Sequence, residues 1–192
     1  MNTFSFTLRT TSLCVAAALL SVSAQAQQKL LPAQSEIAFV SKQMGVPVDG
    51  HFKKFDAQIA FDPAKPETSK IAFVIDMGSA TLGAPEPDAE LPKPDWFNVL
   101  KFPQATFQSN AVRKLSAGKY EVAGKLSIKG NVRDVVIPVA LSQAGAVTTA
   151  SGAFPVKRLA FKIGENEWAD IAMVADDVQV KFKLALTGVG SY

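Results

Sequence analysis

The feature that most constrains this chain is the alternation of apolar and polar residues along several segments. Between residues 178 and 186 every second residue is apolar, and Gln179, Lys181 and Lys183 fill positions between them. Successive side chains of a β-strand point to opposite faces, so this pattern predicts a strand with one buried and one wet face. Three further segments alternate in the same way: 71–77, 120–128 and 135–141. Together they favour an antiparallel sheet.

Turn signals such as Ala144-Gly145 and Gly164-Glu165-Asn166 separate these segments. With the turns as boundaries, the sequence predicts eight strands: 34–44, 46–61, 69–78, 104–116, 119–129, 132–143, 146–163 and 176–189. Prolines interrupt the pattern between residues 84 and 103, which we predict to be a proline-rich loop with a short helix near 95–99.

Eight long, sequential antiparallel strands with one apolar face either close into a barrel or fold as a two-sheet sandwich. Long strands favour the barrel, because they coil around its axis. The interior of an eight-stranded barrel is either just filled by side chains or holds one small ligand. The predicted fold is therefore an all-β, eight-stranded antiparallel barrel.

The N-terminal residues have a different character. Arg9 is followed by a short apolar run at 13–22, and Ala24-Gln25-Ala26 offers small residues at the two positions that a signal peptidase reads. We therefore expect residues 1–26 to be a signal peptide cleaved after Ala26, and residues 27–192 to form one periplasmic domain. An uncleaved membrane anchor is the alternative, although the run is short for a bilayer span. Cleavage would remove the single cysteine, Cys14.

Five motifs occur in order along the remaining chain. They are 48–55 with 59–63, 95–99 with 101–109, 124–133, 137–139, and the region from Arg158 through Phe161 to Trp168. Together they resemble the YceI-like family of bacterial periplasmic, lipocalin-like proteins that bind polyisoprenoids. The resemblance covers roughly residues 35–186, and it implies a lipocalin-like barrel that carries an isoprenoid lipid, either a polyprenyl compound or a quinone.

Two positions depart from the family pattern. Asp88-Ala89-Glu90-Leu91 stands where the family has a histidine, and Leu159-Ala160 stands where it has an acid. Both departures remove polar groups near the expected position of a ligand head group. The resemblance therefore leaves the identity of the head group open.

Candidate ligand-binding residues come from the apolar face, because a cavity for a hydrocarbon chain is lined by rings and branched aliphatic side chains. The predicted set is Phe39, Phe73, Ile75, Trp96, Phe97, Phe107, Leu126, Ile128, Ile137, Arg158, Phe161, Phe182 and Leu184. The alternative for each apolar member is a solid core. Trp96 and Phe97 form either a lid or a local anchor of the loop, and Arg158 binds either an anionic head group or a structural partner.

Other functions find less support in the sequence. A net charge of +3, with basic residues only in pairs, argues against nucleic-acid binding. The single histidine, His51, has no cysteine or histidine partner, so we predict no metal site, cofactor or catalytic residue. A homodimer and, for a quinone ligand, a membrane redox protein are the partners to be considered.

Two alternatives remain open. The first is an enzyme acting on a small apolar substrate in the same cavity, which would need a nucleophile, a base and an orienting group at one point. The second is an integral outer-membrane barrel, with apolar residues turned outward and aromatic girdles. Two tyrosines and two tryptophans are few for such girdles.

Overall fold

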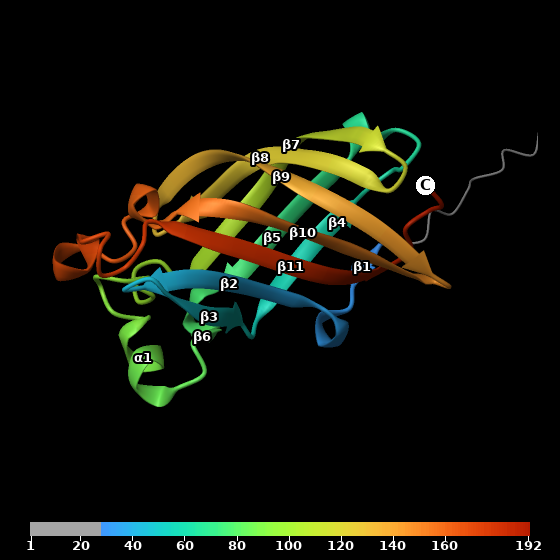
Figure 1. Cartoon of the computed structure of the whole chain (residues 1–192). Coiled ribbons are helices and arrows are strands. Elements are labelled where there is room, and N and C mark those ends of the chain that lie inside the picture. Colours follow the sequence, from blue (N-terminus) through green and yellow to red (C-terminus); the bar gives the residue numbers. More distant parts are fainter. Residues whose placement is uncertain (1–27) are drawn as a thin grey trace, which may run out of the picture.

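The computed structural model describes residues 28–192, whose strands form one antiparallel sheet curled around an apolar interior (Figure 1). The long strands are β2 (Glu36–Gln43), β3 (Val46–Phe52), β4 (Phe55–Ala60), β5 (Lys70–Asp76), β7 (Gln104–Ser116), β8 (Lys119–Ile128), β9 (Asn131–Ala144), β10 (Val147–Lys157) and β11 (Asp177–Thr187). Two short strands are β1 (Lys29–Leu30) and β6 (Ala80–Thr81). The α-helix is α1 (Pro85–Glu90). The 3-10 turns are η1 (Pro32–Gln34), η2 (Pro66–Thr68), η3 (Met77–Ser79), η4 (Arg158–Phe161) and η5 (Asn166–Ala169).

The strands follow the order β4-β5-β7-β8-β9-β10-β11-β2-β3-β6, and β1 pairs with β11. Every pairing is antiparallel, and most neighbours are consecutive in the chain. The longest-range pairing between long strands joins β11 to β2 and sets Phe182 opposite Ile37. The curled sheet forms a half-barrel, and the predicted all-β antiparallel class is confirmed.

The predicted strand count and some strand limits are wrong. Segment 46–61 breaks at Lys53-Lys54 into β3 and β4, because Ser79 accepts hydrogen bonds from both main-chain N–H groups at the bend. Segment 146–163 ends as a strand at Lys157, and η4 begins at the next residue, Arg158. The two-residue strands β1 and β6 carry too little alternation to be recognised in the sequence.

The short helix also lies elsewhere than predicted. It occupies 85–90 instead of 95–99, which forms turns. Pro85 starts the helix at a position where a missing N–H is tolerated, and Glu86 and Asp88 lie in its first turn, where acids are favourable.

The apolar sides of the strands face the interior. In β7, for example, Ala105 and Phe107 are buried while Gln104, Thr106 and Gln108 are exposed. This arrangement is the reverse of the one that the outer-membrane alternative requires.

No helix within residues 28–192 is long and apolar enough to cross a membrane. The predicted signal peptide lies outside the described residues.

Candidate functional site

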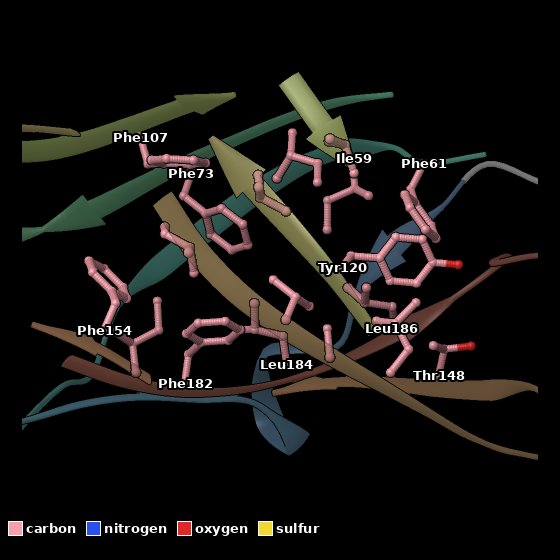
Figure 2. A pocket seen from close by; sticks show the side chains of 18 of the residues that line it. Ile59, Phe61, Phe73, Phe107, Tyr120, Thr148, Phe154, Phe182, Leu184 and Leu186 are labelled. Atoms are coloured by element: carbon pink, nitrogen blue, oxygen red, sulfur yellow. The ribbon is translucent and has the colours of Figure 1, made fainter. Parts of the chain in front are cut away.

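Two adjoining apolar cavities occupy the interior of the half-barrel. The inner cavity has a volume of about 140 Å³ (Figure 2). The loop-end cavity, of about 270 Å³, lies beneath the loops that follow α1 and η4. Five wall residues belong to both cavities: Ile37, Ile75, Leu126, Phe154 and Val180. Because ligand pockets have volumes of roughly 300 to 1,000 Å³, a lipid chain would need both cavities.

Glycines keep the interior hollow by giving phenylalanine rings room against the sheet. Three buried or half-buried glycines on the strands each lie under a ring, in the pairs Gly50–Phe39, Gly124–Phe107 and Gly152–Phe182. A Cβ atom at these glycines would lie only 2.3 to 2.6 Å from a carbon of the ring. Each ring therefore lies close to the backbone, and the space at the centre stays open.

The predicted ligand-binding residues line these cavities, with one exception. The inner cavity is lined by Phe73, Phe107, Ile137, Phe182 and Leu184, the loop-end cavity by Phe39, Trp96, Phe97, Ile128 and Arg158, and both by Ile75 and Leu126. Phe161 lines neither: it is buried in η4, with the Arg133 guanidinium 5.9 Å from its ring centre. Contact of the other residues with a ligand stays a prediction.

Several wall residues were missed in the sequence. Phe61 follows the end of β4, and Ile59 precedes it on the same face. Phe154 was hidden because Gly152 and Pro155 interrupt the alternation of its strand. Tyr120 and Thr148 were passed over because they carry hydroxyl groups, although Tyr120 does follow the alternation.

Arg158 is buried in the wall of the loop-end cavity, where its guanidinium donates five hydrogen bonds of 2.6 to 3.1 Å to main-chain carbonyl oxygens. The accepting residues are Ile163, Gly164, Trp168, Val174 and Ala175. Burial lowers the pKa of Arg158, and the nearby Asp176 carboxylate partly opposes this. Because a guanidinium has five N–H donors, this network favours the structural role over a contact with an anionic head group.

Lys129 makes a second buried polar connection at the same end. Its ammonium group donates to the carbonyl oxygens of Pro94 and Lys162, both at 2.6 Å, and to a carboxylate oxygen of Glu165 at 2.8 Å. The β8–β9 turn is thereby tied to the proline-rich loop and to the segment after η4. Together Lys129 and Arg158 fix the loops over the cavity.

Trp96 and Phe97 combine the two roles that the sequence left open. Both line the loop-end cavity. Phe97 also packs on Phe52 with ring centres 6.3 Å apart, and Trp96 packs on Trp168 at 5.5 Å. The rings therefore anchor the loop and cover the cavity at once.

The acids of α1 have different partners. Asp88 accepts hydrogen bonds from the Thr81 hydroxyl and the Leu82 N–H, and these bonds lower the pKa of Asp88. Glu90 lines the loop-end cavity and forms an ion pair with Lys93 at 2.6 Å. An anionic head group at the loop end would need an unpaired cation, but the wall there carries the Glu90 carboxylate instead.

The side chains that could bind a metal or transfer a proton are scattered over the described part of the chain. No group of three or more His, Cys, Asp or Glu side chains within 28–192 is placed to hold a metal ion. His51 is exposed on β3 and lines neither cavity.

Comparisons with known proteins agree with this fold. Residues 29–186 match the model of the YceI-like domain. A UPF0312 protein from Ectopseudomonas mendocina is 32% identical over 130 residues, which is 66% of this chain and 68% of that protein.

Solved structures show the same architecture. The crystal structure of Burkholderia cenocepacia BcnA superposes with a TM-score of 0.79 at 44% identity, covering 82% of this chain and 99% of BcnA. A polyisoprenoid binding domain from Saccharophagus degradans, implicated in plant cell wall breakdown, superposes with a TM-score of 0.68 over 84% of this chain and 98% of that domain. At 16% identity, the latter similarity concerns the fold alone.

Proposed function

The chain belongs to the YceI-like family, and on that basis we propose that it is a periplasmic binding or carrier protein for an isoprenoid-type lipid, a polyprenyl compound or a quinone. The observation that carries the proposal is the pair of adjoining cavities with mainly apolar walls. The structural neighbour from Saccharophagus degradans, described as a polyisoprenoid binding domain, shares this fold.

The energy of burying a hydrocarbon chain supports useful affinity. Transfer of about ten CH2 groups from water, at ~0.8 kcal/mol each, gives ~8 kcal/mol before the cost of ordering the ligand. Micromolar binding requires about 8 kcal/mol net, so an isoprenoid of several units has apolar surface to spare.

The character of the walls supports binding over catalysis. Among residues 28–192, the only ionisable group on the wall of the inner cavity is the phenol of Tyr120, whose pKa is raised by burial. In the loop-end cavity, the Arg158 donors are held by carbonyl oxygens and the Glu90 carboxylate is paired with Lys93. An enzyme would need a nucleophile, a base and an orienting group that converge on one point.

The periplasmic location is proposed from the N-terminal sequence. Release of the protein by osmotic shock, together with an N-terminal sequence starting at Gln27, is the expected result. A full-length chain that stays in the membrane fraction would contradict it.

Native mass spectrometry of the protein purified from the periplasm, with organic extraction of bound material, tests the function. The expected result is one isoprenoid per chain. A ligand-free mass that does not change after addition of polyprenols and quinones would overturn the proposal.

A cavity-filling variant makes this test specific. Leu126 belongs to both cavities, so Leu126→Phe should block the passage between them and lower lipid occupancy. Val136→Phe is the matched control, because Val136 lies on the neighbouring strand β9 and is 58% exposed. Thermal unfolding of both variants verifies that each is folded.

A further inference from the structure

One end of the inner cavity carries two buried hydroxyl groups, of Tyr120 and Thr148. Tyr120 is 2% exposed and Thr148 is 0% exposed, and both line the cavity. Within the described part of the chain, neither hydroxyl oxygen has a hydrogen-bond partner. Figure 2 shows both side chains at the same end of the cavity, beside Leu186 and away from Phe107.

The burial of two hydroxyl groups without hydrogen-bond partners needs a physical explanation. A buried hydroxyl without a partner loses its hydrogen bonds to water and gains none in exchange, and folded proteins rarely tolerate this. Phenylalanine and valine have nearly the same shapes as tyrosine and threonine, so they would build the same wall without that loss. Two such groups in one apolar cavity point to a ligand that supplies the missing partner.

The topology places the two residues at the same end of the sheet. Tyr120 lies near the start of β8 and Thr148 near the start of β10, and β9 pairs with both strands. Thr148 pairs with Leu186 near the end of β11. The strands β8 and β10 both start at the end of the barrel opposite to α1 (Figure 1).

The surroundings limit the ligand group to an uncharged one. The residues that line the inner cavity include no Lys, Arg, Asp, Glu or His side chain. The Lys114 ammonium lies 6.0 Å from the Tyr120 ring centre, but its side chain is exposed and does not line the cavity. An anion inside the apolar walls would therefore lose its hydration without a buried cation to replace it. Both hydroxyls can donate or accept, because burial raises the pKa of Tyr120 and keeps its phenol protonated.

We propose that the hydroxyls of Tyr120 and Thr148 form hydrogen bonds with the uncharged polar end of the lipid, an alcohol hydroxyl or a quinone carbonyl, at the deep end of the inner cavity. The hydrocarbon chain then runs toward the loop-end cavity. This inference rests on the proposed function and adds to it the head-group class and the orientation of the ligand.

Affinity measurements with three probes test the anchoring. The probes are geranylgeraniol, geranylgeranyl phosphate and the oxygen-free hydrocarbon of the same chain, and the variants are Tyr120→Phe, Thr148→Val and both together. Loss of one hydrogen bond typically weakens binding about fivefold, so the double variant should bind geranylgeraniol at least about tenfold more weakly. Binding of the hydrocarbon should stay unchanged, and the phosphate should bind weakly to every form.

Thr149→Val is the matched control, because Thr149 is the next residue of β10 and its side chain points to the opposite face. It should bind geranylgeraniol as the unmodified protein does. An equal loss of affinity for the alcohol and the hydrocarbon, or no loss for the alcohol, would overturn the inference and leave the proposed function intact. Binding of none of the three probes would overturn both.

The orientation has its own readout, because the two tryptophans, Trp96 and Trp168, both line the loop-end cavity. Bromine quenches tryptophan fluorescence at short range. With its hydroxyl at Tyr120, 16-bromohexadecan-1-ol should place bromine near these rings and quench them, whereas 2-bromohexadecan-1-ol should not. The reverse pattern, with both probes bound, would show the head group at the loop end and overturn the inference.

Discussion

Arg158 and Asp88 show how single polar residues hold the loop end over the cavity. Arg158 is among the ligand-binding residues predicted from the sequence. The sequence did not show that five carbonyl oxygens from residues 163–175 surround its guanidinium. Those acceptors come from irregular segments whose paths no periodicity encodes. For the same reason, the sequence marked Asp88 as a departure from the family pattern and gave no sign of its bond to Thr81.

Removal of the Arg158 side chain should destabilise the fold strongly. Arg158→Ala leaves several buried carbonyl oxygens without a donor, and we expect a loss of about 3 to 5 kcal/mol in the free energy of unfolding. Urea-induced unfolding measures it. Arg113→Ala is the control: Arg113 is largely exposed and pairs with Glu121 on the surface, so its loss should cost about 1 kcal/mol or less. Equal effects of the two substitutions would contradict the structural role of Arg158.

Removing the unpartnered hydroxyls of Tyr120 and Thr148 should instead stabilise the fold. In the protein without ligand, Tyr120→Phe and Thr148→Val each remove a buried polar atom without a partner, and each should raise the free energy of unfolding by about 1 kcal/mol. Thermal unfolding of the delipidated protein measures the change. A marked fall in stability for both would indicate that the hydroxyls have partners in the folded chain.

Asp88 gives the loop end a pH dependence of defined sign. Its hydrogen bonds lower its pKa from the usual value of 3.8, so the folded state favours the carboxylate. The stabilisation is present above pH 3.8 and is lost as the pH falls through the lower pKa of the folded protein. Asp88→Asn should therefore be less stable than the unmodified protein at neutral pH, and the difference should vanish in acid. A difference in unfolding midpoint that is constant with pH would contradict this.

At the scale of elements, alternation predicted the strands well because one face of the sheet is apolar along most of its length. It failed at the bend between β3 and β4, where Ser79, distant in sequence, takes the main-chain hydrogen bonds. The alternation also gave no indication that glycines inside the strands make room for aromatic rings. The Phe39 ring packs against Gly50 because the register between β2 and β3 places the two residues opposite each other. This register could not be predicted from the sequence.

Gly50 is the cleanest place to test how the rings are held. The three atoms nearest to a Cβ there all belong to the Phe39 ring, the first at 2.3 Å, whereas at Gly124 and Gly152 the nearest atom is a main-chain oxygen. Gly50→Ala should push the ring into the loop-end cavity, cost about 1 to 3 kcal/mol of stability and weaken lipid binding. Gly190→Ala, with nothing within 4 Å, should change neither quantity. Unchanged lipid affinity in Gly50→Ala would show that the ring has another place to move.

At the scale of the whole molecule, the N-terminal segment bridges two parts of the sheet. β1 pairs with β11, while the Gln28 side chain donates to the Phe61 carbonyl at 2.6 Å and accepts from the Phe61 N–H at 2.8 Å. The general architecture was predictable from the sequence. This bridge was not, because a side-chain amide that replaces a strand neighbour leaves no periodic signal.

The bridge should be visible in hydrogen exchange. Gln28→Ala removes the acceptor of the Phe61 N–H, and exchange at Phe61 should become about fivefold faster, as expected for one hydrogen bond. Gln34→Ala is the control, since Gln34 is exposed in η1. Exchange at Phe61 that is equally slow in both variants would mean that another group protects this amide.

The pairing of β2 with β11 also sets the order in which the molecule can fold. The hairpins from β7 to β11 join neighbours in the chain and can form as each strand becomes free. The β2–β3 hairpin is also local, but it joins the rest of the sheet through β11, where residue 182 pairs with residue 37. The wall that holds Ile37 and Phe39 is thus completed by the last strand of the chain, so the binding cavity is among the final features of the protein to appear.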